Sequence, residues 1–138
     1  MSSVLLDTHI FMWLIDGSDK LTQKAKREIE LCCQSEGNLL ISVISIWEIG
    51  MLRQKGRITI KEPLSQWVNE ALRSPYINLI PLSPEIAIES CSLPGEFHGD
   101  PADRIITATS RVMNVSLLTK DGRIQGYAQE GHLKCISV

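Results

Sequence analysis

The chain has 138 residues, of which 43% are hydrophobic and 22% charged, and its formal net charge is −2. These values are typical of one globular domain with its own core, and they exclude a disordered chain, a collagen-like repeat and a disulfide-rich scaffold. The slightly acidic balance also argues against a protein that coats DNA through a general basic excess, but not against a nucleic-acid enzyme with a local basic patch.

In the first half of the chain, short apolar runs alternate with helical patterns. Residues 3–7 form an apolar run that is too short for a helix, and we expect a buried strand there. Helical patterns follow over residues 9–15 and 21–35, the second with apolar side chains at helical spacing. Residues 38–42 predict a second strand, which leads directly into a helix over residues 43–55.

The second half continues the alternation. We expect, in order, a helix over residues 63–73, a strand over residues 76–82, a helix from Ser83, a helix from Asp100 to Asn114, and strands over residues 115–120 and 133–138. Ser83 and Asp100 each precede a proline, which is a typical start of a helix. Pro81 places the strand before Ser83 near the edge of its sheet, because proline cannot donate a ladder hydrogen bond.

Strands that alternate with helices predict an α/β fold. We expect one domain over residues 1–138, with a five-stranded, mostly parallel sheet flanked by helices. In such folds ligands bind beyond the carboxyl ends of the strands, which is therefore where the chemistry is expected.

The sequence shows no sign of a membrane protein or of a disulfide framework. The N-terminus lacks the basic start and long apolar run of a secretory signal, and no uncharged stretch reaches the ~20 residues of a membrane span. Cys32, Cys33, Cys91 and Cys135 lack the spacing of metal ligands. We expect four buried, reduced thiols, a cytoplasmic protein and no membrane contact.

Four acidic residues stand where such a fold binds ligands. Asp7 and Asp121 follow the first and fourth expected strands, Asp103 lies in the first turn of a helix, and Glu48 lies among apolar residues within a helix. Each has an ordinary alternative explanation as a turn former, a helix-start acid or a solvated side chain. If all four converge, their repulsion requires a cation, and hard oxygen ligands favour Mg²⁺ or Mn²⁺.

Other chemistries find no support in the sequence. It contains no glycine-rich phosphate loop and no nucleophilic-serine elbow. His9, His98 and His132 lack ligand spacing, which favours buried or loop-anchoring roles for them. A phosphoacceptor-aspartate domain usually has an acidic pair after its first strand, whereas Thr8 and His9 follow Asp7 here.

Four segments resemble, in chain order, the motifs of PIN-domain toxins of the VapC type, found in type II toxin–antitoxin systems. They are Leu5-Leu6-Asp7-Thr8-His9-Ile10-Phe11-Met12-Trp13, then Ser42-Val43-Ile44-Ser45-Ile46-Trp47-Glu48-Ile49, then Leu93-Pro94 with His98 and Asp100-Pro101-Ala102-Asp103-Arg104, and finally Leu117-Leu118-Thr119-Lys120-Asp121 with Ile124 and Tyr127. Together they span residues 5 to 127.

The resemblance implies a PIN-like domain with Mg²⁺- or Mn²⁺-dependent endoribonuclease activity, the toxin of a toxin–antitoxin pair. It implies cleavage of RNA phosphodiesters, with tRNA or rRNA loops as expected substrates. It also implies a homodimer that a cognate antitoxin protein inhibits, with a higher assembly of toxin and antitoxin as a further expectation.

Residue by residue, the resemblance assigns the acidic metal site to Asp7, Glu48, Asp103 and Asp121. Asp7 and Asp103 are expected to hold the principal ion, with Asp121 and Glu48 holding a second ion or positioning the attacking water. Asp100 becomes the helix cap. We further expect Thr119 to orient a carboxylate by hydrogen bonding, and Arg104 to bind a substrate phosphate.

Two rival interpretations remain. The first is a catalytically silent PIN-like module that binds RNA or protein, against which the presence of all four acids argues. The second, weaker one is a metal-dependent phosphatase acting on small molecules. The sequence leaves open whether the basic run from Arg53 to Lys61 contacts RNA, and Phe97 and His98 are candidates for stacking on bases.

Overall fold

The computed structural model describes residues 3–138 and contains five strands and seven helices in one α/β domain. The elements are β1 (Val4–Leu6), α1 (Thr8–Asp16), α2 (Gln23–Gln34), β2 (Leu39–Ser42), α3 (Val43–Gln54), α4 (Leu64–Ala71), β3 (Ile77–Ile80), α5 (Pro84–Cys91), α6 (Pro101–Met113), β4 (Ser116–Thr119), α7 (Gly122–Gln129) and β5 (Cys135–Ser137). All five expected strands are present, each shorter by one to three residues at its ends than the apolar run that predicted it.

The strands form one sheet in the order β3-β2-β1-β4-β5, and every pairing is parallel. The expectation of a five-stranded, mostly parallel sheet is therefore confirmed. β3 lies at the edge, as Pro81 indicated. The chain leaves β1 toward β2 and β3 and later returns to the other side of β1 with β4, so the strand order reverses at β1. The crevice beyond the carboxyl ends of β1 and β4 is therefore the expected ligand site.

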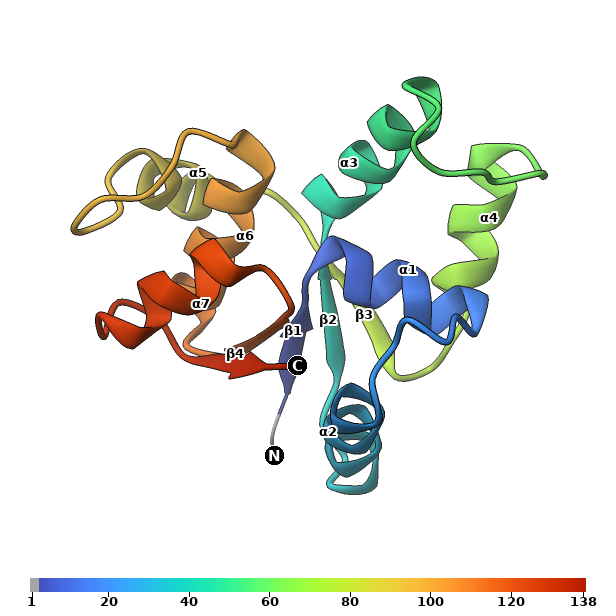
Figure 1. Cartoon of the computed structure of the whole chain (residues 1–138), viewed down its shortest axis with the longest axis horizontal. Helices are drawn as coiled ribbons and strands as arrows, with labels where there is room; N and C mark the ends of the chain where they lie inside the picture. The colour runs from blue at the N-terminus through green and yellow to red at the C-terminus, as the bar shows by residue number, and fades with distance from the viewer. Residues whose placement is uncertain (1–2) are drawn as a thin grey trace.

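Helices cover both faces of the sheet (Figure 1). Alternate residues of β1, β2 and β4 pack into the cores on the two faces. On β1, Val4 and Leu6 pack with α1, α2 and α4, whereas Leu5 packs with Ile106 of α6 and Ile124 of α7. Both faces of the central strands β1 and β2 are buried, which explains why these two strands are apolar runs without polar alternation.

One helix and the burial of three cysteines differ from expectation. No helix was expected after Asp121, yet α7 begins there, because Asp121 caps it and Ile124 and Tyr127 bury one face of it. All four cysteines were expected to be buried, and for three of them that prediction is wrong. Only Cys32 is buried, Cys33 and Cys135 are partly exposed, and Cys91 lies exposed at the end of α5. The cysteines among residues 3–138 form no disulfide.

None of the helices within residues 3–138 is long and apolar enough to cross a membrane.

Candidate active site

Asp7 stands at the carboxyl end of β1 and begins α1. Its Oδ1 accepts a hydrogen bond from the Thr8 amide at 2.8 Å, and its Oδ2 accepts one from the Thr119 hydroxyl at 2.5 Å. The side chain is 8% exposed. Asp7 therefore caps a helix and at the same time presents its carboxylate at the edge of the sheet where ligands bind.

Asp121 occupies the equivalent place after β4. Its Oδ1 accepts hydrogen bonds from the amides of Arg123 and Ile124 and so caps α7. Its own amide donates to the Thr119 hydroxyl at 3.0 Å. Because β1 and β4 are paired, one threonine contacts both acidic positions, donating to the Asp7 carboxylate and accepting from the Asp121 backbone. This is the hydrogen-bonding geometry expected of Thr119, while its effect on function stays a prediction.

Asp103 and Asp100 share the first turn of α6. The Oδ1 atom of Asp100 accepts a hydrogen bond from the Asp103 amide at 3.0 Å, which makes Asp100 the helix cap, as expected. Asp103 itself is 8% exposed. Its Oδ2 lies 2.7 Å from Nε2 of His98.

Glu48 reaches the same place from α3. That helix follows β2 directly and is capped by Ser42, so its second turn lies beyond the carboxyl ends of the strands. Carboxylate oxygens of Glu48, Asp100 and Asp103 lie within 4.8 Å of one another. The side chain of Glu48 is half-buried and points at other carboxylates.

These acids line one pocket of about 480 Å³. It is lined by Asp7, His9, Ile10, Trp13, Glu48, Leu52, Arg57, Ile58, Asp100, Asp103, Lys120, Asp121 and Arg123. The structure thus brings together all four acids that the sequence predicted, and it adds Asp100.

Burial and mutual repulsion raise the pKa of three of these carboxyl groups. Desolvation is the largest cause for Asp7, Glu48 and Asp103, and neighbouring acids raise each pKa further. Hydrogen bonds oppose the rise, from Thr119 and Thr8 at Asp7 and from His98 at Asp103. Folding therefore assembles carboxylates at a free-energy cost that a bound cation would offset.

Basic side chains line the same pocket. Arg57, Lys120 and Arg123 all contribute to its wall. Nη2 of Arg123 lies 3.6 Å from Oδ2 of Asp103 and 3.9 Å from Oδ2 of Asp121, and its side chain is 63% exposed. The Lys120 ammonium lies 5.5 Å from the centre of the Trp13 ring. The pocket thus combines buried or partly buried acids with exposed cations, an arrangement that suits an anionic polymer whose reacting phosphate must meet a metal ion.

Arg104 lies elsewhere. Its Nε donates to the carbonyl of Ser90 at 2.9 Å, and its Nη1 donates to the carbonyls of Phe97 and His98 at 3.0 and 3.1 Å. These donors hold the loop between α5 and α6, and Arg104 does not line the acidic pocket. The phosphate contact stays a prediction, and the geometry favours a loop-holding role instead.

The contributions of His98 and Asp100 were not predicted from the sequence. Asp100 was treated only as a cap, although its side chain also joins the group of carboxylates. His98 was interpreted as a loop anchor or a stacking residue, and its bond to Asp103 was not foreseen. A histidine five residues before an acid, across a glycine and a proline, carries no periodicity that would reveal such a contact.

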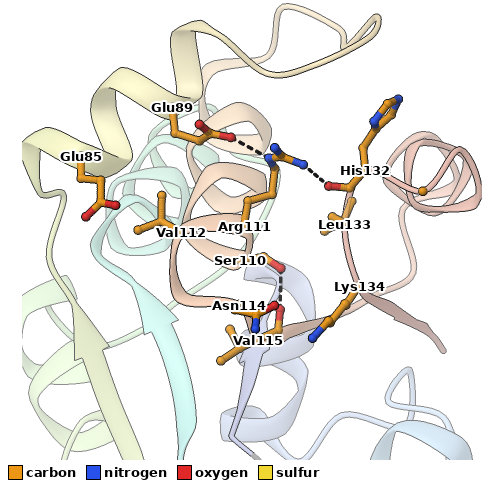
Figure 2. A pocket seen from close by; sticks show the side chains of 11 residues that line it. Glu85, Glu89, Ser110, Arg111, Val112, Asn114, Val115, His132, Leu133 and Lys134 are labelled. Atoms are coloured by element: carbon orange, nitrogen blue, oxygen red, sulfur yellow. Dashed lines mark hydrogen bonds and ion pairs between the residues drawn. The ribbon is translucent and has the colours of Figure 1, made fainter.

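A second cavity, of about 510 Å³, lies beyond the amino ends of β4 and β5 (Figure 2). Two of its charged groups, Arg111 and Glu89, are paired. Nε of Arg111 lies 2.6 Å from a carboxylate oxygen of Glu89, and the Arg111 guanidinium also donates to the carbonyl of His132. No group of three or more acidic, histidine or cysteine side chains close enough to share an ion is found there within residues 3–138. The acidic pocket is therefore the candidate active site.

Comparison with known proteins shows which family the chain resembles. The ribonuclease VapC22 of Mycobacterium tuberculosis is 31% identical over 127 residues, which cover 92% of this chain and 93% of that protein. A toxin–antitoxin complex from Klebsiella pneumoniae contains a chain that superposes with a TM-score of 0.62 at 26% identity, covering 89% of this chain and 91% of that one.

A further solved structure shows the same fold at lower identity. It is VapBC2 from Rickettsia felis bound to a DNA fragment from its promoter, with a TM-score of 0.69, 18% identity and 98% of each chain covered. The family model described as the PIN domain matches residues 4–130, which include all the acids of the pocket. The chain belongs to the PIN domain family.

Proposed function

We propose that this protein is a divalent-metal-dependent endoribonuclease and the toxin of a toxin–antitoxin pair. The observation that carries the proposal is the pocket in which Asp7, Glu48, Asp103 and Asp121 converge beneath exposed cations. The ribonuclease named among its relatives supports RNA as the substrate class.

The donor set fits Mg²⁺ or Mn²⁺. It consists of carboxylate oxygens, which are hard ligands, and it contains no cysteine. We expect Asp7 and Asp103 to hold the principal ion, with Glu48 and Asp121 completing the site or orienting the attacking water. A bound ion of this kind supplies an activated water and offsets the charge that develops on the phosphodiester.

The protein's own side chains have defined tasks in this mechanism. Thr119 donates to Oδ2 of Asp7 and fixes the rotamer in which the other lone pairs face the pocket. Arg123 lies near two of the acids with most of its side chain in solvent, so it can move onto a phosphate when RNA enters. Arg57 and Lys120 provide two further phosphate contacts from the pocket wall.

Single-stranded loops, such as those of tRNA or rRNA, are the substrates that we propose, because their phosphates and unstacked bases are accessible to a pocket of this size. Stacking of RNA bases on Phe97 is less favoured by the structure. The ring of His98 already covers Phe97, with centroids 4.3 Å apart, and the edge of Tyr127 also packs against it.

The proposed partners are a cognate antitoxin and a second copy of the chain. Several solved relatives are toxin–antitoxin complexes. Trp47 of α3 and Ile88 of α5 are 50% and 70% exposed and are the apolar residues that we expect in such contacts. A cytoplasmic location, in which thiols stay reduced, is also part of the proposal.

The first test is cleavage of a diverse pool of structured RNA by purified, antitoxin-free protein in Mg²⁺, Mn²⁺ or EDTA. Asp7→Asn is the variant, and Glu85→Gln in the second cavity is the matched control. We expect metal-dependent cleavage that Asp7→Asn loses and Glu85→Gln retains.

Three other outcomes would count against the proposal. Cleavage that survives both EDTA and Asp7→Asn would show that the metal mechanism is wrong. Binding of RNA without cleavage in either metal would favour the silent binding module. Hydrolysis of a phosphate monoester, with intact RNA, would favour the phosphatase.

A further inference from the structure

The loop between α5 and α6, residues 92–100, supplies Asp100 to the acidic pocket and also contacts Asp103 through His98. Nε2 of His98 lies 2.7 Å from Oδ2 of Asp103, and the His98 side chain is 20% exposed. Asp103 is surrounded by other acids, so its carboxylate has few protein partners. The other side chain that approaches Oδ2 is the largely exposed Arg123, at 3.6 Å. The side chain within hydrogen-bond distance of this oxygen, and the more buried of the two, is therefore His98.

A row of four rings in contact, of which His98 and Phe97 are stacked, fixes the position of His98. Its ring stacks on Phe97 at 4.3 Å and an interplanar angle of 26°. Phe97 in turn meets Tyr127 of α7 at 4.8 Å, and Tyr127 meets His132 at 4.7 Å. The Tyr127 hydroxyl donates to the carbonyl of Pro94 in the same loop at 2.5 Å. The imidazole is thus attached to the body of the domain and cannot easily follow a rotation of Asp103.

Arg104 connects α6 back to the same loop. It follows Asp103 on α6, and its Nη1 donates to the carbonyls of Phe97 and His98. The helix therefore holds the loop through Arg104, while the loop holds the helix's acid through His98. The contacts thus form a closed circuit between two adjacent residues of α6, Asp103 and Arg104, and the adjacent loop residues 97 and 98. Such a circuit restricts the position of the Asp103 carboxylate more than one hydrogen bond does.

We propose that His98 is a positioning residue for Asp103. By holding Oδ2, it orients the carboxylate so that Oδ1 and the free lone pairs point at the metal position, and it prevents the acid from turning toward Arg123. Hydrogen-bond partners of metal-ligating carboxylates commonly set ligand orientation in this way. The inference rests on the proposed function, since it requires the acidic pocket to bind a cation.

The test is a calorimetric titration of the purified protein with Mn²⁺, without RNA. We expect His98→Ala to weaken Mn²⁺ binding about 10- to 100-fold, the usual cost of removing such a partner. We expect His98→Gln to recover most of the affinity, because its side-chain amide keeps an N–H donor at a similar reach. Glu85→Gln, in the second cavity, is expected to bind Mn²⁺ as the unmodified protein does.

A second measurement separates positioning from a general loss of structure. The melting temperature of each variant is measured without metal, and RNA cleavage is followed at increasing Mn²⁺. We expect the cleavage rate of His98→Ala to approach that of the unmodified protein when Mn²⁺ is saturating. If His98→Ala does not fold, the comparison of His98→Gln with the unmodified protein still tests the proposal, because near-normal affinity is required of it.

The outcomes distinguish this inference from the proposed function. If the unmodified protein binds Mn²⁺ and His98→Ala binds it equally well, the positioning role is wrong and the metal site stands. If His98→Gln loses as much Mn²⁺ affinity as His98→Ala, the His98 imidazole serves packing alone and the inference is again wrong. If the unmodified protein binds no Mn²⁺, the proposed metal-dependent function fails, and the role of His98 fails with it.

Discussion

The two ends of β4 carry cavities of nearly equal size, about 480 and 510 Å³, whose charges are arranged in opposite ways. In the cavity beyond its amino end, Arg111 is paired with Glu89 at 2.6 Å. In the pocket beyond its carboxyl end, the pKa values of Asp7, Glu48 and Asp103 are raised by burial and by neighbouring acids, among them Asp100 and Asp121.

This difference in charge pairing indicates that the cavity at the amino end contributes to stability and the pocket at the carboxyl end to function. A paired charge contributes modestly to the free energy of unfolding and needs nothing from solution. Buried acids that lie close together without enough basic partners lower the free energy of unfolding of the metal-free protein. A group of such acids in a folded protein therefore indicates a ligand that offsets their charge. Cavity size alone would not have chosen between the two ends.

The most direct test of this difference between the two cavities is to neutralise one acid in each of them. We expect Asp7→Asn to reduce RNA cleavage by at least about a hundredfold, the scale on which loss of one electrostatic group at a reacting centre is felt. Glu85→Gln should leave cleavage unchanged. Initial rates at saturating Mg²⁺ measure both, and equal rates for the two variants would remove the distinction between the ends.

The pH dependence of stability should show the same contrast. Because the pKa of Asp7 is raised on folding, the folded state binds more protons than the unfolded state between about pH 4 and that raised pKa. Asp7 therefore favours the folded state only at low pH, and metal-free protein loses that contribution as the pH rises. Urea unfolding should show Asp7→Asn gaining stability relative to the unmodified protein as the pH increases, and a constant difference would contradict this.

Mn²⁺ should reverse this loss. Binding to the folded state alone stabilises by about 2.7 kcal/mol at a hundredfold excess over the dissociation constant. We expect this gain to be larger at neutral than at acid pH, because protons compete with the ion for the carboxylates. Melting temperatures with Mn²⁺ and with EDTA at several pH values measure it, and a gain independent of pH would place the ion elsewhere.

A smaller effect, on stability, is expected from substitution of Gly95, which lies in the loop between α5 and α6. Its φ is +67°, and an added Cβ would lie 2.8 Å from Nε2 of His132, a residue of the second cavity. We expect Gly95→Ala to lower the free energy of unfolding by about 1–2 kcal/mol through backbone strain and displacement of that ring. Chemical denaturation measures the loss, with Gly99→Ala, where no atom lies within 4 Å of the added Cβ, as the control.

The smallest effect is expected for Glu89→Gln, which removes the ion pair with Arg111 but keeps a hydrogen-bonding side chain. The pair is 28% exposed on each side, so the expected loss is about 1 kcal/mol or less. RNA cleavage should not change. A loss of cleavage at unchanged stability would show that the second cavity takes part in function.

Much of this protein follows from local sequence patterns. The buried strands are continuous apolar runs, and the caps at Ser83 and Asp100 mark the starts of α5 and α6. The positions of Asp7 and Asp121 after paired strands were predictable, because parallel strands bring their carboxyl ends to one edge of the sheet. Helix α7 was missed because a glycine-containing segment has weak helical propensity, and the burial of Ile124 and Tyr127 compensates for it.

Contacts between a loop and a distant helix could not be predicted from the sequence, because they follow no periodic pattern, and they were seen only in the tertiary structure. The sequence by itself determined the fold class and the sheet, and it pointed to the four acids as candidates, because strand ends, helix starts and an acid among apolar residues are local signals. Only the folded chain decided that Asp100 joins the group of acids, that Arg104 faces loop carbonyls, and that His98 holds Asp103. The physical reason is that side-chain direction in a loop depends on the packing of distant rings and helices, which leave no pattern in the residues that they position.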